Sequence, residues 1–371
     1  MEESDLKDLK DLTEAIKTEN ISEVKRILDQ EQEYVLIDLD IFILAFQRGN
    51  LPIISLLIEN VEDWGDLSWE ISLYLVRGRY FKILSHLAND FFQHIIEASI
   101  EVDDLEIIKL IFENKSLDEI DDPDIILCRA IEKERLEIIQ FFLDSGMGIS
   151  EYCLAEAIKI KNLSLLKELY PFAKLESLGA FLIKTASEVG EIKILKFLVE
   201  KKNVIDDDAL IGAVKKGHLG IVQYLLNIKA PTNKNVLVEA VKNWNSKIVE
   251  MLLNNKVPIS QESLEEAVKR GSLKLVKYIL EYFEYSGQKI NEYPMTLAST
   301  VGNEEITKVL IEHKSPVNSF ALLKASEYGN KEIVKLLINY NAPIDEYAIP
   351  RAVKNGHEEI AKILAKYISK E

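Results

Sequence analysis

Apolar residues recur along the chain in two linked helical patterns. In the stretch AVKKGHLGIVQYLL, residues 213–226, Ala213 serves as a reference position, with Leu210 three residues before it and Gly217 four residues after it. An apolar residue and an alanine three positions apart lie on one face of a first helix. Four apolar residues then follow at the spacing of the inner face of a second helix: Ile221, Val222, Leu225 and Leu226.

The same pattern returns along the chain, mostly at intervals of 27 to 31 residues. The reference alanines are Ala15, Ala45, Ala130, Ala157, Ala186, Ala213, Ala240, Ala267, Ala298, Ala325 and Ala352. Between residues 60 and 124 the helical apolar spacing continues, but the pair of alanine and glycine is lost. The spacing predicts about thirteen helical hairpins, because such a period is typical of repeat proteins.

Each predicted hairpin needs its neighbours. The glycine after the first helix adopts positive φ at little cost and so ends that helix. The alanine stands where two antiparallel helices approach too closely for a larger side chain. A single hairpin cannot bury its own apolar face, whereas a stack of hairpins can. We therefore expect an all-α, curved solenoid of helical hairpins.

Three stretches resemble the ankyrin repeat: AVKKGHLGIVQYLL, ASEYGNKEIVKLLI and AVKNGHEEIAKIL. YPMTLA, residues 293–298, is similar to the opening of that repeat and keeps its proline and alanine. The resemblance covers essentially the whole chain, and it implies an ankyrin-like fold and the binding of another protein. The usual ankyrin period is about 33 residues, so the shorter period here implies shortened or absent β-hairpin fingers. Similar short repeats occur in large DNA viruses of amoebae, intracellular bacteria and protists.

Charge divides the chain unevenly. The net charge of the 371 residues is −17, but residues 1–150 carry 34 acidic and 14 basic residues, whereas residues 151–371 are slightly basic. We expect an acidic part with capping and degenerate repeats, residues 1–124, and a part with regular repeats and a C-terminal cap, residues 125–371, in one continuous solenoid. The negative total argues against general nucleic-acid binding, which needs an excess of Lys and Arg.

No pattern of catalytic residues stands out. The phosphate-binding, nucleophile-elbow and zinc-protease motifs are missing, and Gly217-His218 recurs as Gly356-His357, which indicates a structural turn. Cys128 and Cys153 have no metal-ligand spacing, and we expect small core residues in a reducing compartment. The sequence predicts a non-enzymatic protein without catalytic, cofactor-binding or metal-binding residues and without a cofactor. The short apolar runs predict no membrane span and a cytoplasmic location, or the host cytoplasm for a viral or bacterial effector.

Two groups of residues are candidates for binding a partner. Basic side chains near the ends of first helices form a predicted stripe: Lys215, Lys216, Lys242, Lys269, Arg270 and Lys354. Cations at this end also complement the helix dipole, so a purely structural role stays open. The unit EYFEYSGQKINEYPMTL, residues 281–297, is four residues longer than its neighbours, and it is expected to bring aromatic side chains together around a loop: Tyr282, Phe283, Tyr285 and Tyr293. The alternative is that these aromatic residues pack over the gap that a longer loop opens.

A third candidate is the irregular region of residues 60–124, which is either a docking region or a set of drifted repeats. Taken together, the sequence predicts a protein-binding scaffold or adaptor that engages an acidic or extended segment of another protein on a concave surface. The alternative is a structural component that assembles with itself or a larger particle. Nucleic-acid binding is less favoured, and neither a membrane nor a small-molecule substrate is expected.

Overall fold

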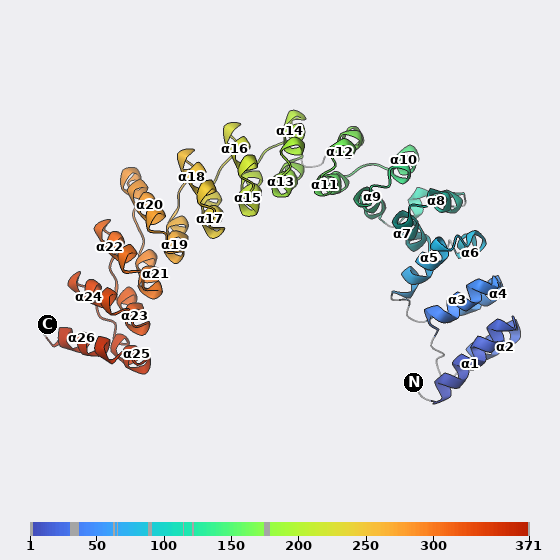
Figure 1. Cartoon of the computed structure of the whole chain (residues 1–371), viewed down its shortest axis with the longest axis horizontal. Helices are drawn as coiled ribbons and strands as arrows, with labels where there is room; N and C mark the ends of the chain where they lie inside the picture. The colour runs from blue at the N-terminus through green and yellow to red at the C-terminus, as the bar shows by residue number, and fades with distance from the viewer. Residues whose placement is uncertain are drawn as a thin grey trace. The chain divides into compact units, whose positions relative to one another are not determined.

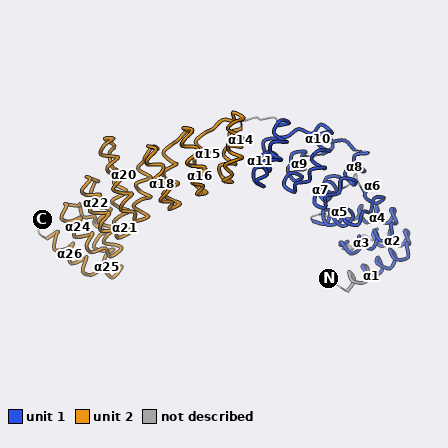
Figure 2. Tube along the Cα trace, turned by 45° about the horizontal axis from the view of Figure 1, so that its top comes forward, with its two compact units in different colours: residues 1–176 blue, residues 177–371 orange. Residues whose placement is uncertain are grey.

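The computed structural model describes residues 3–29, 37–61, 64, 66–87, 91–113, 115–120, 122–173 and 179–369. The chain forms two compact units, unit 1 (residues 1–176) and unit 2 (residues 177–371), which Figure 2 shows in different colours. The compositional boundary at residues 124 and 125 therefore falls inside unit 1. Within each unit, consecutive helices pair into hairpins, and the hairpins stack in chain order (Figure 1).

Unit 1 contains twelve α-helices among its described residues. They are α1 (Glu3–Lys17), α2 (Ile21–Leu28), α3 (Leu39–Arg48), α4 (Leu51–Glu59), α5 (Leu67–Arg77), α6 (Phe81–Leu87), α7 (Phe92–Val102), α8 (Leu105–Phe112), α9 (Pro123–Glu132), α10 (Leu136–Asp144), α11 (Glu151–Lys159) and α12 (Leu163–Leu169). Two short 3₁₀ helices accompany them, η1 (Leu117–Glu119) and η2 (Tyr170–Phe172).

Unit 2 contains fourteen α-helices among its described residues. They are α13 (Ala180–Val189), α14 (Ile192–Glu200), α15 (Asp207–Lys216), α16 (Leu219–Asn227), α17 (Lys234–Lys242), α18 (Ser246–Asn254), α19 (Gln261–Lys269), α20 (Leu273–Ser286), α21 (Tyr293–Val301), α22 (Glu304–Glu312), α23 (Ser319–Glu327), α24 (Lys331–Asn339), α25 (Ala348–Lys354) and α26 (Glu358–Ile368). The odd-numbered helices are the first helices of the hairpins, and the predicted all-α repeat fold is confirmed.

One backbone feature marks every hairpin. In all thirteen hairpins of the described ranges, the residue four positions after the reference position has positive φ, which ends the first helix. Seven of these residues are glycines, as the sequence indicated, and six are not: Glu19, Arg79, Asp103, Glu134, Lys161 and Trp244. Stacking against neighbours thus imposes the left-handed turn even where the residue type disfavours it.

The irregular region of unit 1 keeps the hairpin geometry. Leu75 (1% exposed) and Ser99 (0% exposed) occupy the reference position there, and the left-handed residues Arg79 and Asp103 follow each by four. Two of its aromatic side chains pack together: the rings of Trp64 and Phe91 meet edge to face at 4.8 Å. These repeats differ in sequence from the others and retain the same packing.

The side chain that begins the second helix ties the hairpin together. In several hairpins an Asn or Asp at this N-cap accepts a hydrogen bond from an amide in the first turn, as Asn245 does from the Ile248 amide (3.2 Å). In others the side chain reaches the preceding hairpin: the Nε2–H of His218 donates to the carbonyl of Glu188 (2.9 Å). His218 therefore lies in the structural turn that its recurrence in the sequence indicated.

The links between hairpins are short. Six residues connect α16 to α17, and an isolated parallel bridge between Ile149 and Ala173 is the only β pairing in the described ranges. The expectation of shortened or absent β-hairpin fingers is therefore confirmed. Because no finger covers them, the exposed side chains of the first helices are accessible to solvent.

The four extra residues of unit 281–297 do not form the loop that the sequence suggested. They extend α20, which has 14 residues where α18 and α22 have nine. The physical reason is the apolar spacing of Val276, Ile279, Leu280 and Phe283, which continues the buried face of the helix by one more turn.

Candidate binding surface

The six basic residues of the predicted stripe all lie at the ends of first helices in unit 2. Lys215 and Lys216 close α15, Lys242 closes α17, Lys269 and Arg270 end α19, and Lys354 closes α25. First helices that follow one another pack side by side (Figure 1). We call the exposed side of these helices the first-helix face of unit 2.

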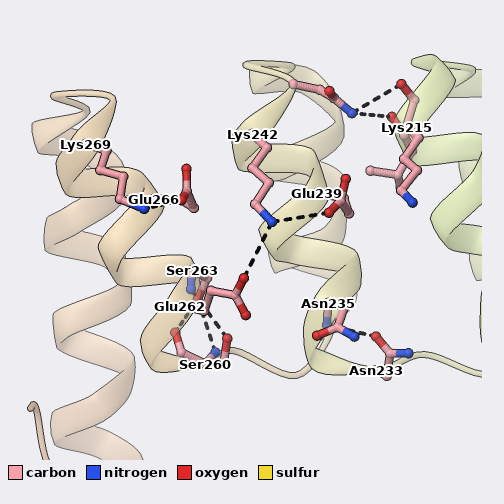
Figure 3. A network of polar contacts seen from close by, with 12 residues as sticks. Lys215, Asn233, Asn235, Glu239, Lys242, Ser260, Glu262, Ser263, Glu266 and Lys269 are labelled. Atoms are coloured by element: carbon pink, nitrogen blue, oxygen red, sulfur yellow. Dashed lines mark hydrogen bonds and ion pairs between the residues drawn. The ribbon is translucent and has the colours of Figure 1, made fainter.

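Acidic neighbours engage part of the stripe. The Lys242 ammonium lies 3.4 Å from the Glu239 carboxylate and 3.5 Å from that of Glu262, so it bridges α17 and α19 (Figure 3). Desolvation lowers the pKa of Lys242, but the two carboxylates outweigh it and raise the pKa overall. Lys269 lies 2.7 Å from Glu266, whose hydrogen bond raises the pKa of Lys269. These two cations stabilise the stack, and part of their charge is already compensated.

Arg270 also links two neighbouring hairpins. Its guanidinium donates a hydrogen bond to the carbonyl of Lys242 (2.6 Å), at the C-terminus of the preceding first helix. Asn243 makes the equivalent bond to the carbonyl of Lys215 (3.2 Å). Since the last carbonyls of a helix lack partners within it, these side chains cap one hairpin from the next.

Three lysines of the stripe form no ion pair in the described part of the chain. They are Lys215, Lys216 and Lys354, and all three are exposed. The stripe that is available to a partner is therefore a pair of adjacent lysines on α15 and a single lysine on α25. Their role in binding stays a prediction.

The four aromatic residues of the predicted loop separate into exposed and buried positions. Tyr285 is 92% exposed and Tyr293 is 48% exposed, and Tyr282 is 36% exposed on α20. Phe283 is 1% exposed and belongs to the core, so its assignment to a partner-binding group is wrong. Its ring lies on the face of α20 that packs into the unit, which excludes contact with a partner.

The structure adds an aromatic row that the sequence analysis missed. Tyr293, Phe320 and Tyr347 each stand five residues before a reference alanine, on or directly before α21, α23 and α25. They are 48%, 50% and 56% exposed. Because these three first helices pack in succession, the three side chains form a row on the first-helix face. The identical offset from the reference alanine was the signal in the sequence.

A cation and a second aromatic residue extend this row on α23. The Lys324 ammonium lies 5.5 Å from the centroid of the Phe320 ring and 5.7 Å from that of Tyr328. Cation–π contacts of this length hold the rings in place. Lys324 also lies 2.9 Å from Glu327, which pairs with Arg351 of α25 at 3.0 Å. The row is thus flanked by an ordered network that joins two hairpins.

A groove lies on the opposite helix layer, between α18 and α20. It encloses about 640 Å³ and is lined by apolar and aromatic side chains that include Trp244, Val249, Leu253, Leu275 and Tyr278. Trp244 is 57% exposed and has φ of 55°, a conformation that is unusual for a bulky residue. The groove is distinct from the first-helix face.

In the described part of the chain, no group of three or more His, Cys, Asp or Glu side chains is placed to hold a metal ion. None of the helices in the described ranges combines the length and the apolar character that a membrane crossing requires.

The match to a family model agrees with the geometry of the hairpins. A family model described as ankyrin repeats (3 copies) matches residues 182–263, 264–348 and 295–371, which together span slightly more than half of the chain. The ankyrin repeat domain of human ASB11 is 21% identical, with a TM-score of 0.40, over 49% of this chain and 96% of that domain. No curated protein sequence matches the chain significantly. On the match of the family model, the chain belongs to the ankyrin-repeat family.

Proposed function

We propose that the protein is a non-enzymatic scaffold or adaptor that binds an extended, acidic segment of another protein on the first-helix face of unit 2. Ankyrin repeats are in general protein–protein interaction modules, which supports the coarser part of this proposal. The finer part concerns the surface and the chemistry of the partner.

The observation that carries the proposal is the row of Tyr293, Phe320 and Tyr347. Three half-exposed aromatic side chains stand at the same position of consecutive hairpins and form a row. Tyrosine and other aromatic residues supply much of the binding energy at protein interfaces. An extended segment that crosses the stacked helices would meet one ring per hairpin.

The charge preference of the partner follows from the lysines on the same face. Lys215 and Lys216 are exposed cations without a carboxylate partner in the described residues, whereas Lys242 and Lys269 are paired. A partner with acidic side chains would gain from the uncommitted lysines and would compete with Glu239 and Glu266 for the others. Such contacts weaken with rising salt concentration.

The test is affinity capture from the native source, read by mass spectrometry, with the wild-type chain and three variants. The first variant combines Tyr293→Ala, Phe320→Ala and Tyr347→Ala. Its matched control combines Phe172→Ala and Tyr340→Ala, which remove exposed aromatic side chains outside the row and outside the predicted binding residues. The third combines Lys215→Glu and Lys216→Glu.

We expect a partner that the control retains, that the row variant loses and that the lysine variant binds more weakly. A partner that all variants retain equally would refute the first-helix face as the binding surface. In that case the groove beside Trp244 becomes the next surface to test. Because the replaced side chains are all exposed, we expect every variant to fold. Circular dichroism of each variant checks its helical content, so that a lost partner can be assigned to lost contacts.

A further inference from the structure

The two cysteines of the chain lie next to each other in unit 1. Cys128 belongs to α9 and Cys153 to the first turn of α11, and these are consecutive first helices that pack together. Their Sγ atoms are 3.0 Å apart, although 25 residues separate them in sequence. Both are free thiols in this structure. The bond length of a disulfide is about 2.05 Å, so a movement of about 1 Å separates the pair from a covalent link.

From this geometry we propose that Cys128 and Cys153 form a reversible disulfide when the protein meets a peroxide, and that the bond clamps α9 to α11. This site is independent of the proposed partner surface on unit 2.

The surroundings of the pair give an oxidant access. Cys128 is half-buried and lines a cavity of about 520 Å³ together with Ile125, Arg129 and Tyr152. Cys153 is 0% exposed, directly behind it. A molecule as small as hydrogen peroxide fits a cavity of this size, whereas the deeper thiol is shielded from larger reagents. The two cysteines can therefore react with one another more readily than either can react with a thiol of another molecule.

Local hydrogen bonds distinguish the two sulfurs. The two sulfurs lie within hydrogen-bond distance, and either thiol can be the donor. This contact lowers the pKa of Cys153 and raises that of Cys128. The Ser150 hydroxyl donates a second hydrogen bond to the Cys153 sulfur (3.5 Å). Ser150 is also the N-cap of α11, and the N-terminus of a helix favours a thiolate. Deprotonation of either cysteine would place a thiolate in contact with a thiol, which is the arrangement that disulfide formation requires.

The reaction balances with one peroxide as the oxidant. The thiolate of one cysteine attacks a peroxide oxygen, the O–O bond breaks, and the released hydroxide becomes water with the proton that the thiol gave up. The sulfur is then a sulfenic acid. The second cysteine attacks this sulfur, the S–S bond forms, and a second water leaves with the remaining proton. Two thiols and one hydrogen peroxide thus give one disulfide and two waters.

The Cys128–Cys153 disulfide would affect the exposed surface of α9 and α11 as well as the stability of unit 1. The cavity beside the pair is lined by Ile125 and Tyr152, which are 52% and 67% exposed and each stand five residues before a reference alanine. A covalent link between α9 and α11 fixes the spacing between these two side chains. Oxidation would therefore hold this part of unit 1 in a single arrangement.

The experiment titrates the reduced, full-length protein with hydrogen peroxide. Free thiols are counted with a thiol reagent in denaturant, and unreduced peptides are analysed by mass spectrometry. We expect the two thiols to disappear together, the intact chain to lose two hydrogen atoms, and one cross-linked peptide pair to contain Cys128 and Cys153. Dithiothreitol should restore both thiols, and the oxidised protein should unfold at a higher temperature than the reduced protein.

Two comparisons make the test specific to the folded geometry. The internal disulfide should form at least roughly tenfold faster in the folded than in the urea-unfolded chain, because folding holds the sulfurs together. Cys128→Ala and Cys153→Ala should each leave one cysteine that a sulfenic-acid probe labels and that forms no internal link. Equal rates in both states, a disulfide between two chains, or independent oxidation of the two thiols in the wild-type protein would overturn the proposal.

Discussion

Substituting Gly190 with alanine should destabilise the protein in a way that depends on His218. Gly190 ends α13 with φ of +87°, and a Cβ there would lie 2.5 Å from the His218 ring. That ring donates to the Glu188 carbonyl. Gly217 ends α15 with φ of +76°, but the nearest atom to its Cβ would be the Asn245 amide nitrogen at 3.6 Å, an ordinary contact. The two glycines therefore share the backbone conformation and differ in the space around them.

The magnitudes follow from these contacts. A left-handed conformation costs an alanine about 1–2 kcal/mol, and the lower entropy of the unfolded chain returns about 0.4–1 kcal/mol. Gly217→Ala should therefore cost about 1 kcal/mol. Gly190→Ala also displaces His218 from its hydrogen bond, which adds about 0.5–1.5 kcal/mol. We expect a total of about 2 kcal/mol for Gly190→Ala.

The assay is urea unfolding followed by circular dichroism for the wild type, Gly190→Ala, His218→Ala and the double variant, with Gly217→Ala as the matched control. Without the imidazole the clash is gone, so Gly190→Ala should cost only about 1 kcal/mol in the His218→Ala background. The coupling between the two sites is then about 1 kcal/mol. A coupling below about 0.3 kcal/mol would refute the steric reasoning and reduce the role of Gly190 to its backbone conformation alone.

Three further outcomes follow from single residues. Trp244→Gly should stabilise unit 2 by up to about 1 kcal/mol in urea unfolding, because glycine relieves the left-handed strain at some entropic cost; a destabilised variant would mean that the indole packs in the groove. Phe283→Ala should cost about 3–5 kcal/mol in the same assay, since the ring is 1% exposed. The hydrogen bond from Lys324, together with that from Arg351, lowers the pKa of Glu327 below its ordinary value of 4.5. This pairing therefore stabilises the fold above that pH and is lost as the pH falls through the lowered pKa. The wild type should thus be more stable than Glu327→Gln at neutral pH, with the difference vanishing in acid; a difference independent of pH would show that the charge contributes nothing.

The fold could be predicted from the sequence where the reference alanine and the helical apolar spacing occur together. Two hairpins lack the alanine and the glycine because other residues occupy these positions: Leu75 and Ser99 at the reference position, and Arg79 and Asp103 at the left-handed turn. The reference position constrains the size of the side chain, and the turn position constrains the backbone conformation. Several residue types are accepted at the turn, at a cost of about 1–2 kcal/mol for the left-handed conformation. Stacking between neighbouring hairpins contributes more stabilising free energy than this cost. The hairpin geometry therefore persists where the sequence pattern is lost.

The candidate surface was only partly predictable, for physical reasons. The sequence places Lys242 and Lys269 at helix ends, but the bridge from Lys242 to Glu262 depends on the spacing between two stacked hairpins. Phe283 was misplaced because four additional residues extend a helix as readily as a loop. Its spacing from Ile279 was the clue that favoured the helix.

The aromatic row has a stronger claim to function than the basic stripe because packing does not require it. At the same offset, the hairpins of α15, α17 and α19 carry Asp208, Asn235 and Glu262, so the fold accepts polar residues there. Lysines at helix ends, in contrast, stabilise the helices that carry them. Half-exposed rings at Phe320 and its neighbours leave apolar surface in water, and each Å² that a partner covers would contribute about 25 cal/mol. A feature that stability does not require, repeated on three adjacent helices, is best explained by a contact made outside the chain.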